Sequence, residues 1–329
     1  MGIELSVLVV NYYAEELLPA LLISMENVLS GNNSEVLVWD NGSRNGKPSD
    51  LTLPSPLVWL PSSANVGFAN GHNALAQTGK GKRFLIINPD AEFAPGGLQK
   101  LWEAAEENPQ AGIVVPRIQF PDGQLQVSVF PPYAFSFDLR KSFWLEYVTL
   151  FSRPQRKMVR QLSEAKEPFP VGWASGACML VSRQVWEKVG GFDPNFFFGG
   201  EDADFCQRVW MAGFEVLCEP RALLIHHAGQ SLEREQRRKV LFYYQKRLYY
   251  ARKHFSRLQY GILWLASAGE LVAKWAGGFF LSFFSHRWKE KRRGYAGALA
   301  LIFSGRWRNT ERLMQKKGGE IHKPAEAVV

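Results

Sequence analysis

The first ninety residues alternate short apolar runs with longer segments of mixed polarity. The apolar runs have the length of buried strands and lie at 5–10, 35–39, 57–60 and 84–87. The segments at 15–29 and about 70–77, and the one after Pro95, are expected to form helices. Strands that alternate with helices in this way predict an α/β fold with a mostly parallel sheet and helices on both faces.

Polar residues lie at or just past the ends of these predicted strands. They are Asn11, Asp40, Asn65 and Asp90. Ligands of parallel sheets bind beyond the carboxyl ends of the strands. A structural role alone would scatter such residues, so their common position predicts a ligand site at one rim of the sheet.

The middle of the chain has less regular patterning. A hairpin is predicted within 113–129, around Pro121-Asp-Gly123, and 130–170 forms a long excursion that is aromatic and charged but has no clear period. Regular elements are expected again as a strand at 171–181, a helix leading to Gly190, a helix at about 203–212 and an apolar strand at 222–225.

The C-terminal third combines helical spacing with many aromatic residues. Residues 240–258 are predicted to be helical, and 260–285 are strongly apolar but contain Glu270 and Lys274. Each charge at the centre of a spanning helix costs about 2.5–3.5 kcal/mol. We therefore expect an interfacial helix, or a pair of them. The alternative is a helical subdomain packed on the preceding α/β region.

Charge is distributed unevenly along the chain. The net charge is +8, yet residues 1–230 carry 18 Lys and Arg against 24 Asp and Glu, whereas 231–329 carry 21 against 7. Because the basic part is also rich in Trp, Phe, Leu and Tyr, it favours an anionic membrane surface over nucleic acid. The basic run 287–293 would add roughly 1 kcal/mol of attraction per cation.

Cysteine usage and the N-terminus indicate the compartment. Cys178, Cys206 and Cys218 form no close pair with metal-ligand spacing, which favours buried packing roles. The chain enters its first predicted strand directly after Gly2, without the pattern of a signal peptide. Together with the basic tail, these features predict a peripheral protein on the cytoplasmic face of the inner membrane.

A series of motifs in order resembles the GT2 glycosyltransferases, and more narrowly their bacterial rhamnosyltransferase-like members. The motifs are Val10-Asn-Tyr12, Asp40-Asn-Gly-Ser43, Asn65-Val-Gly-Phe-Ala-Asn-Gly-His-Asn73, Asn88-Pro-Asp90, Gly190-Gly-Phe-Asp193 with Phe198-Gly-Gly-Glu-Asp-Ala-Asp-Phe-Cys-Gln-Arg208, and Ile225-His-His-Ala-Gly-Gln-Ser231. Each motif is weak alone, but the ordered series is specific.

The resemblance implies a GT-A fold over residues 1–230. The charge and composition described above predict a membrane-associating helical region over 231–329. The resemblance also implies an inverting transfer of a sugar from a nucleotide donor, first of all dTDP-rhamnose, to a hydroxyl. The acceptor expected is a lipid-linked glycan in the synthesis of bacterial surface polysaccharide, because the tail would hold the enzyme where such substrates reside.

A departing nucleoside diphosphate needs a metal or fixed cations to stabilise its charge. Mg²⁺ and Mn²⁺ prefer oxygen ligands and often use only one or two protein carboxylates. Asp90 is the candidate ligand, and His226 resembles the C-terminal histidine that completes the metal or diphosphate site, with His227 as its competitor. The family often has two acids in this motif, whereas Asn88 holds the first place here. A turn at Asp90 is the structural alternative.

The resemblance places the donor's nucleotide and sugar against a further group of residues. Asp40 would accept the imide N–H of uracil or thymine, which cytosine lacks. The structural alternative is that Asp40 and Ser43 build a turn. The glycine loop would let backbone N–H groups approach the donor. The full set predicted for the donor is Asn11, Tyr12, Asp40, Asn65, Gly67, Gly71, Asn73 and Asn88.

An acceptor hydroxyl needs a base in line with the anomeric carbon. The resemblance assigns this role to Asp202, with Glu201 beside it. Three acids within Glu201-Asp-Ala-Asp204 repel one another, which should raise at least one pKa. Asp204 is the member best explained as a helix cap.

Three other functions remain to be weighed. Another nucleotide hexose, linked to UDP or GDP, could be the donor. Sugar-phosphate nucleotidyl transfer would need a Gly-rich loop with Arg and Lys near the N-terminus, and residues 10–14 contain neither. A catalytically inactive membrane scaffold would predict a broken set of acids, yet the set is complete.

Overall fold

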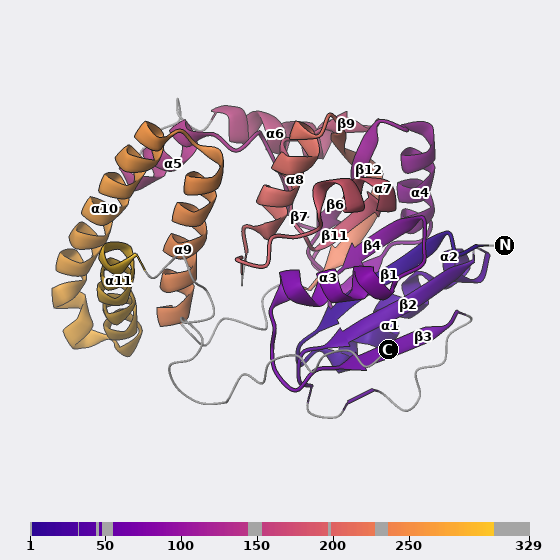
Figure 1. The fold of residues 1–329 in the computed structure, drawn as a ribbon, viewed down its shortest axis with the longest axis horizontal. Helices are drawn as coiled ribbons and strands as arrows, with labels where there is room; N and C mark the ends of the chain where they lie inside the picture. Colours follow the sequence, from indigo (N-terminus) through magenta and orange to yellow (C-terminus); the bar gives the residue numbers. More distant parts are fainter. Residues whose placement is uncertain are drawn as a thin grey trace.

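The computed structural model describes residues 2–31, 33–43, 46–47, 55–143, 153–196, 199–227 and 236–305. Residues 197–198 and 228–235, which carry parts of the last two motifs, lie outside the described residues. Within the described ranges, the chain forms a ten-stranded sheet with flanking helices, and further helices lie to one side of it at the C-terminal end (Figure 1).

One half of the sheet is parallel, as the alternating pattern predicts. It contains β1 (Leu5–Asn11), β2 (Ser34–Asp40), β3 (Leu57–Pro61) and β4 (Arg83–Ile87), in the order β3-β2-β1-β4. Asn11 lies beside Asp40 in register, and Asp40 lies beside Pro61. The carboxyl ends of three neighbouring strands are therefore level at one rim.

The other half of the sheet is mixed. β11 (Cys178–Ser182) runs antiparallel between β4 and β6 (Ala111–Gln119). Beyond β6 lie β12 (Glu215–His226), which is parallel to β6, and β5 (Ala91–Phe93), which is antiparallel to β12. This last pairing sets His226 opposite Ala91, directly after Asp90. The return strand therefore delivers a histidine to the rim where β4 ends.

Short strands complete the middle of the chain. β7 (Leu125–Gln126) turns back on β6, which confirms the predicted hairpin. β9 (Phe169–Pro170) joins β12, and β8 (Val129–Phe130) pairs with β10 (Trp173–Ala174) in a separate ribbon. The excursion at 130–170 contains α5 (Phe135–Ser142) and α6 (Arg153–Glu164).

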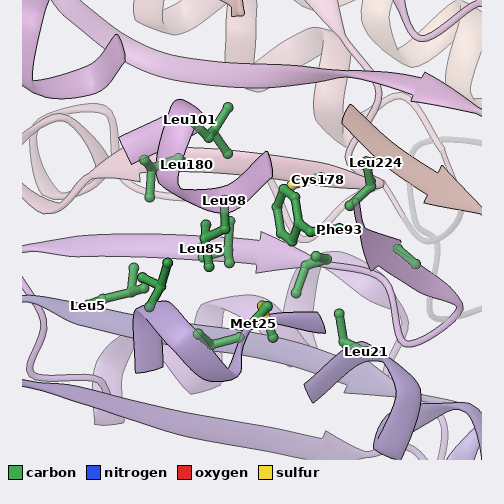
Figure 2. Packing of buried hydrophobic residues seen from close by; sticks show 14 of the residues in the cluster. Leu5, Leu21, Met25, Leu85, Phe93, Leu98, Leu101, Cys178, Leu180 and Leu224 are labelled. Carbon is green, nitrogen blue, oxygen red and sulfur yellow. The ribbon is translucent and has the colours of Figure 1, made fainter. Parts of the chain in front are cut away.

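Helices cover both faces of the sheet because alternate strand residues point to opposite sides. On one face Leu8 and Phe84 pack with α3 (Phe68–Thr78), α7 (Arg183–Val189) and α8 (Glu201–Met211). On the other face Leu5 and Leu85 pack with α1 (Leu18–Ser24), α2 (Glu26–Gly31) and α4 (Gly97–Glu107) (Figure 2). The single helix expected at 15–29 is divided into η1 (Glu15–Leu17), α1 and α2.

The C-terminal helices are α9 (Gln236–His254), α10 (Arg257–Phe284) and α11 (His286–Ser304). The apolar stretch at 260–285 forms most of the single helix α10, which begins at a capping box made by Ser256 and Gln259. Among the described residues, no helix combines the length and the apolarity that crossing a bilayer requires.

The charges inside α10 have an internal explanation. The buried carboxylate of Glu270 accepts hydrogen bonds from Arg247 Nη1 at 2.8 Å and from Lys274 Nζ at 2.5 Å. Arg247, on α9, also lies 3.5 Å from Asp138 of α5 and donates to Ser142 Oγ. These buried pairs join α5, α9 and α10, so Glu270 interrupts the apolar run in order to pack the C-terminal helices together.

Candidate active site

The carboxyl rim of the sheet brings Asp90 and His226 into contact. His226 Nε2 lies 3.2 Å from Asp90 Oδ1 and 3.2 Å from Asn88 Nδ2. On the other side of the ring, Nδ1 lies 3.0 Å from Gln126 Oε1. An amide oxygen only accepts, so Nδ1 holds the proton and Nε2 presents its lone pair to the rim.

This donor set fits a divalent cation. Asp90 Oδ1 and His226 Nε2 lie 3.2 Å apart, close enough for both to bind one cation. Asp90 and His226 are two ligands, which suits an ion that completes its shell with phosphate oxygens and water. Among the described residues, no group of three or more His, Cys, Asp and Glu could hold a metal without such outside ligands.

His227 faces away from this pair. Its Nε2 lies 3.0 Å from Glu92 Oε1, and its backbone N–H donates to the carbonyl of Asp90. Successive residues of a strand point to opposite faces. The structure therefore brings His226 to Asp90 and leaves His227 in a contact with Glu92.

The predicted nucleotide pocket is built on the ends of β1 and β2. Asn11 Nδ2 donates to Asp40 Oδ1 at 3.3 Å, and both residues are buried. Ser43 N donates to the same oxygen at 2.8 Å, and Ser43 Oγ donates to Asp40 Oδ2. Asp40 thus forms a turn and holds the rim together, while Tyr12 is 38% exposed beside it. Recognition of a base by Asp40 stays a prediction.

The glycine loop before α3 combines turn formation with close packing. Asn65 Oδ1 accepts from the backbone N–H of Gly67, whose φ of 86° suits glycine. A Cβ at Gly71 would lie 2.7 Å from a methyl of Val10, so this glycine lets α3 approach β1. Asn73 donates to the carbonyl of Phe192 at 2.8 Å and accepts from its N–H at 3.0 Å. In this structure Gly71 and Asn73 fix the helix, and their contact with a donor stays a prediction.

The carboxylates of Glu201 and Asp202 begin α8. Burial raises the pKa of Glu201 to about 8, and the charge of Asp202 adds to that rise. Burial also raises the pKa of Asp202, against the lowering effects of Lys246 and of the backbone N–H groups of Ala203 and Gly176. Ala203 N donates to Asp202 Oδ1 at 2.8 Å and Gly176 N to Oδ2 at 3.3 Å.

These differences separate the roles of the two acids. Burial and the neighbouring charge of Asp202 favour the protonated form of Glu201, one of whose oxygens is buried without a hydrogen-bond partner among the described residues. Asp202 accepts two backbone hydrogen bonds that favour the ionised form. Two neighbouring carboxyls in different environments are the usual arrangement for an acid–base pair.

The short segment Gly176-Ala177 connects Asp202 to the motif that contains Asp90. Gly176 donates to Asp202, and the next residue, Ala177, accepts from the backbone N–H of Asn88 at 2.9 Å. A Cβ at Gly176 would lie 3.1 Å from the ring of Phe68 and 3.8 Å from Cβ of Asp202. The segment therefore holds the acid pair, the Asn88-Pro-Asp90 motif and the glycine loop against one another.

Asp204 has a different role from the helix cap expected. The N-cap of α8 is Gly200, with no side-chain cap hydrogen bond. Asp204 is instead fully buried, accepts from Arg208 Nε at 2.8 Å, and lies 2.7 Å from His254 Nε2 and 2.8 Å from Lys253 Nζ. Its contacts with Lys253 and His254 hold α9 against α8.

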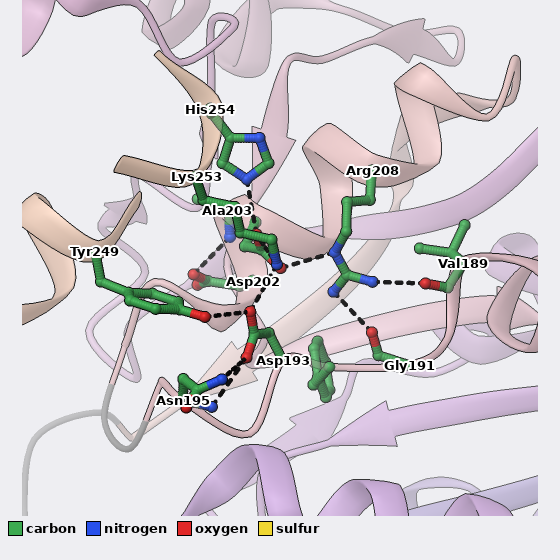
Figure 3. A network of polar contacts seen from close by, with 12 residues as sticks. Val189, Gly191, Asp193, Asn195, Asp202, Ala203, Arg208, Tyr249, Lys253 and His254 are labelled. Carbon is green, nitrogen blue, oxygen red and sulfur yellow. Dashed lines mark hydrogen bonds and ion pairs between the residues drawn. The ribbon is translucent and has the colours of Figure 1, made fainter. Parts of the chain in front are cut away.

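Asp193 forms a second anchor to α9. Its Oδ2 accepts from the hydroxyl of Tyr249 at 2.9 Å and from Lys253 Nζ at 2.6 Å (Figure 3). Sequence reasoning missed Tyr249, Lys253, His254 and Gln126 altogether. The spacing of four between Tyr249 and Lys253 was the available signal for a common helix face, but nothing in the sequence told which acids that face would meet.

The fold and the rim together define a glycosyltransferase of the GT-A type. The model of the family described as "Glycosyl transferase family 2" matches residues 6–190, and that of the "N-terminal domain of galactosyltransferase" matches 156–228. The chain belongs to glycosyl transferase family 2.

Two curated relatives show how the similarity extends along the chain. An N-acetylglucosaminyl-diphospho-decaprenol L-rhamnosyltransferase of Mycobacterium tuberculosis is 32% identical over 237 residues, which cover 68% of this chain and 74% of the relative. A low-salt glycan biosynthesis hexosyltransferase of Haloferax volcanii is 24% identical over 82% of this chain and 84% of its own. The chain is thus similar to rhamnosyltransferases.

Solved structures agree on the fold. A mannosyltransferase of Pyrobaculum calidifontis, in complex with GDP-Man and Mn²⁺, aligns over 95% of this chain and 88% of its own with a TM-score of 0.53 and 16% identity. GalNAc-T7 with UDP, GalNAc and Mn²⁺ aligns over 70% of this chain and 44% of its own, with a TM-score of 0.50 and 16% identity. At this level of identity the likeness concerns the fold alone.

Proposed function

We propose that this chain transfers a rhamnosyl group from dTDP-rhamnose, with inversion, to a hydroxyl of a lipid-linked glycan during synthesis of a bacterial surface polysaccharide. The observation that carries the proposal is the Gly176-Ala177 segment, which bonds to Asp202 on one side and to Asn88 on the other. It would hold the proposed base beside the proposed diphosphate site. The acceptor class is supported by the relative that acts on a diphospho-decaprenol.

In the proposed mechanism, Asp202 is the general base. It takes the proton of the acceptor hydroxyl, whose oxygen forms a bond to the anomeric carbon. The bond from that carbon to the diphosphate breaks, and the diphosphate leaves with the electron pair. Attack and departure on opposite faces invert the anomeric centre.

Asp90 and His226 would hold the Mg²⁺ or Mn²⁺ ion, which when bound supplies positive charge to the departing diphosphate. Gln126 fixes the His226 ring so that Nε2 faces Asp90. Asn88 Nδ2 lies 3.2 Å from the same nitrogen, and a bound ion would replace this contact, because Nε2 has a single lone pair. Asp40, already tied to Asn11 and Ser43, would accept the imide N–H of the thymine.

A panel of sugar nucleotides tests this function. The pure protein, given Mg²⁺ or Mn²⁺ and dTDP-, UDP- or GDP-linked hexoses without an acceptor, is expected to hydrolyse dTDP-rhamnose slowly and faster than the other donors. The released nucleoside diphosphate is measured by chromatography. A different preferred donor would contradict the dTDP-rhamnose assignment, and no hydrolysis or binding of any donor would favour an inactive scaffold.

The matched variant in this assay is Asp90→Ala. We expect it to weaken binding of the metal and of dTDP together, because each supplies ligands to the other. Titration calorimetry of dTDP with and without Mn²⁺ measures this coupling. Glu92→Ala is the control, because Glu92 is the neighbouring carboxylate and contacts His227 instead. An Asp90→Ala protein with unchanged metal dependence and dTDP affinity would show that the ion binds elsewhere.

We also propose that the C-terminal helices attach the enzyme to an anionic membrane surface. α10 exposes an apolar stripe with helical spacing, made of Leu258, Ile262, Leu265, Val272, Trp275, Phe279 and Phe283. Arg292 of α11 lies over the rings of Trp275 and Phe279, at 4.9 and 4.7 Å from their centroids. Apolar side chains bordered by cations suit the boundary between acyl chains and anionic headgroups.

Vesicle co-sedimentation tests this surface. Binding is expected to increase with the fraction of phosphatidylglycerol and to fall at high salt, since the Debye length shrinks from about 10 Å at 0.1 M to about 3 Å at 1 M. The double variant Leu265→Ser/Phe283→Ser should bind less, because both side chains are exposed, at 66% and 70%. The control Met211→Ser changes an equally exposed residue on α8 (72%). If the full-chain protein does not bind anionic vesicles at low salt, this mode of attachment is excluded.

A further inference from the structure

One face of α9 lies along the segment 193–204 that carries the acidic motifs. Gln245 Nε2 donates to the carbonyl of Asn195 at 3.2 Å. Tyr249 and Lys253 contact Asp193, and His254 contacts Asp204. The contacts recur at helical spacing, so α9 is fixed against the loop that leads into the acid pair.

Lys246 lies on the same face of α9, next to the start of α8. A Cβ at Gly199 would lie 2.9 Å from Lys246 Nζ, and one at Gly200 would lie 3.3 Å from Lys246 Cβ. Both glycines have positive φ, of 77° and 99°, and Gly200 directly precedes Glu201. The lysine stem therefore packs over the turn that begins the catalytic helix.

The neighbouring cations Lys253 and His254 of α9 have ion-pair partners. Lys253 binds Asp193 and Asp204, and His254 binds Asp204. Within the described part of the chain, the Lys246 ammonium forms no ion pair and no hydrogen bond. The carboxyls of Glu201 and Asp202 follow the turn on which it packs, so its charge acts on them across the turn.

We propose that Lys246 is a positioning residue of the transferase site, a cation supplied by the C-terminal helices that keeps Asp202 ionised as the base. The inference rests on the proposed role of Asp202. It assigns a part of the active site to α9, which lies beyond the residues 6–190 and 156–228 matched by the family models.

The other groups around Asp202 leave this role to Lys246. Asp204 is neutralised by Arg208, Lys253 and His254. Cys206, on the same helix, has a pKa raised to about 12 by burial. His72, whose ring centroid lies 4.1 Å from that of Phe68, is neutral because burial lowers its pKa to about 4.

Burial and Lys246 act on the acid pair in opposite directions. Burial raises the pKa of Asp202, and the Lys246 charge is the largest of the effects that lower it. Removing the charge must therefore raise the pKa of Asp202. A base works only when deprotonated, so activity should be lost on the acid side of the pH profile and kept on the alkaline side.

The test is the pH dependence of kcat/KM for Lys246→Gln. At the acid end of the profile, kcat/KM should fall about tenfold or more relative to the unaltered protein, because a nearby opposite charge shifts a carboxyl by about 1–3 pKa units. At the alkaline plateau the two proteins should differ by less than about threefold. Lys246→Arg keeps the charge and should restore the acid side.

A matched control separates charge from position. Lys82→Gln removes the same charge beside the amino end of β4, where Lys82 pairs with Glu4, and its profile should overlay that of the unaltered protein. A uniform loss at every pH in Lys246→Gln would show a merely structural role and overturn the inference. An effect confined to KM for acceptors that carry a diphosphate would also overturn it, because Lys246 would then bind the acceptor.

The two proposals fail in different ways. If Asp202→Asn keeps its turnover, the function assigned to Asp202 fails. If Asp202→Asn is inactive while Lys246→Gln keeps an unshifted profile, the base is correct and only the role of Lys246 is refuted.

Discussion

Replacement of Asp202 by asparagine is expected to lower kcat by a factor of about 10²–10⁴, the contribution of a general base. The amide keeps the size of the side chain but cannot take the proton of the acceptor hydroxyl. Donor binding should change little, because the residues predicted to bind the diphosphate are Asp90 and His226. Single-turnover transfer and calorimetric titration of the donor measure the two quantities separately.

Glu201→Gln is the informative comparison for this variant. The pKa of Glu201 is raised to about 8 by burial, so an uncharged amide resembles its neutral-pH state more closely than an amide resembles Asp202. Glu201→Gln should therefore lower kcat less than Asp202→Asn does. The difference in kcat between the two variants should become smaller above about pH 9. The reverse order of effects would exchange the roles of the two acids. Asp122→Asn, in the exposed hairpin turn, serves as the control for the loss of one carboxylate.

The second large effect is expected from Arg247→Met, which should lower the free energy of unfolding by about 3–5 kcal/mol. Arg247 and Glu270 have side chains that are only 2% and 1% exposed, and Asp138 is 3% exposed. Removing the arginine leaves two buried carboxylates with too few partners. An uncompensated buried charge costs far more than the pair contributes when complete.

Urea unfolding followed by tryptophan fluorescence measures this loss, since Trp264, Trp275 and Trp288 lie in the C-terminal helices. The double variant Arg247→Met/Glu270→Gln should recover part of the lost free energy of unfolding, because it removes one buried carboxylate that has lost its partner. Arg160→Met breaks an exposed pair with Glu164 and should cost less than about 1 kcal/mol. If Arg247→Met also lowers the free energy of unfolding by less than about 1 kcal/mol, the buried network does not hold the helices together.

Much of the sheet could be predicted from the sequence because its signals are local. Apolar runs such as 84–87 are bounded by turn residues, and parallel strands must present their carboxyl ends at one edge. The positions of Asn11, Asp40 and Asp90 at the ends of such runs were therefore enough to place them on a common rim. The ordered motifs gave the family, which the match over 6–190 confirms.

Other features depended on which elements meet, and no local pattern determines that. His226 reaches Asp90 through the antiparallel pairing of β12 with β5, and the residues that contact each other are 136 positions apart in the chain. The same pairing turns His227 toward Glu92. The sequence favoured His226 through the family resemblance and left His227 as its competitor, because adjacent residues of a strand cannot be assigned to faces without the pairing.

The acids of α8 and the charges of α10 show most clearly what prediction from the sequence alone cannot provide. By itself, the sequence determined that three acids are crowded in Glu201-Asp-Ala-Asp204 and that Glu270 interrupts an apolar helix. Only the tertiary structure decided that Asp204 binds the α9 residues Lys253 and His254, and that Glu270 pairs with Arg247 inside the protein. The physical reason is that the free energy of a charge depends on its burial and its partners, and both are set by residues distant in the chain.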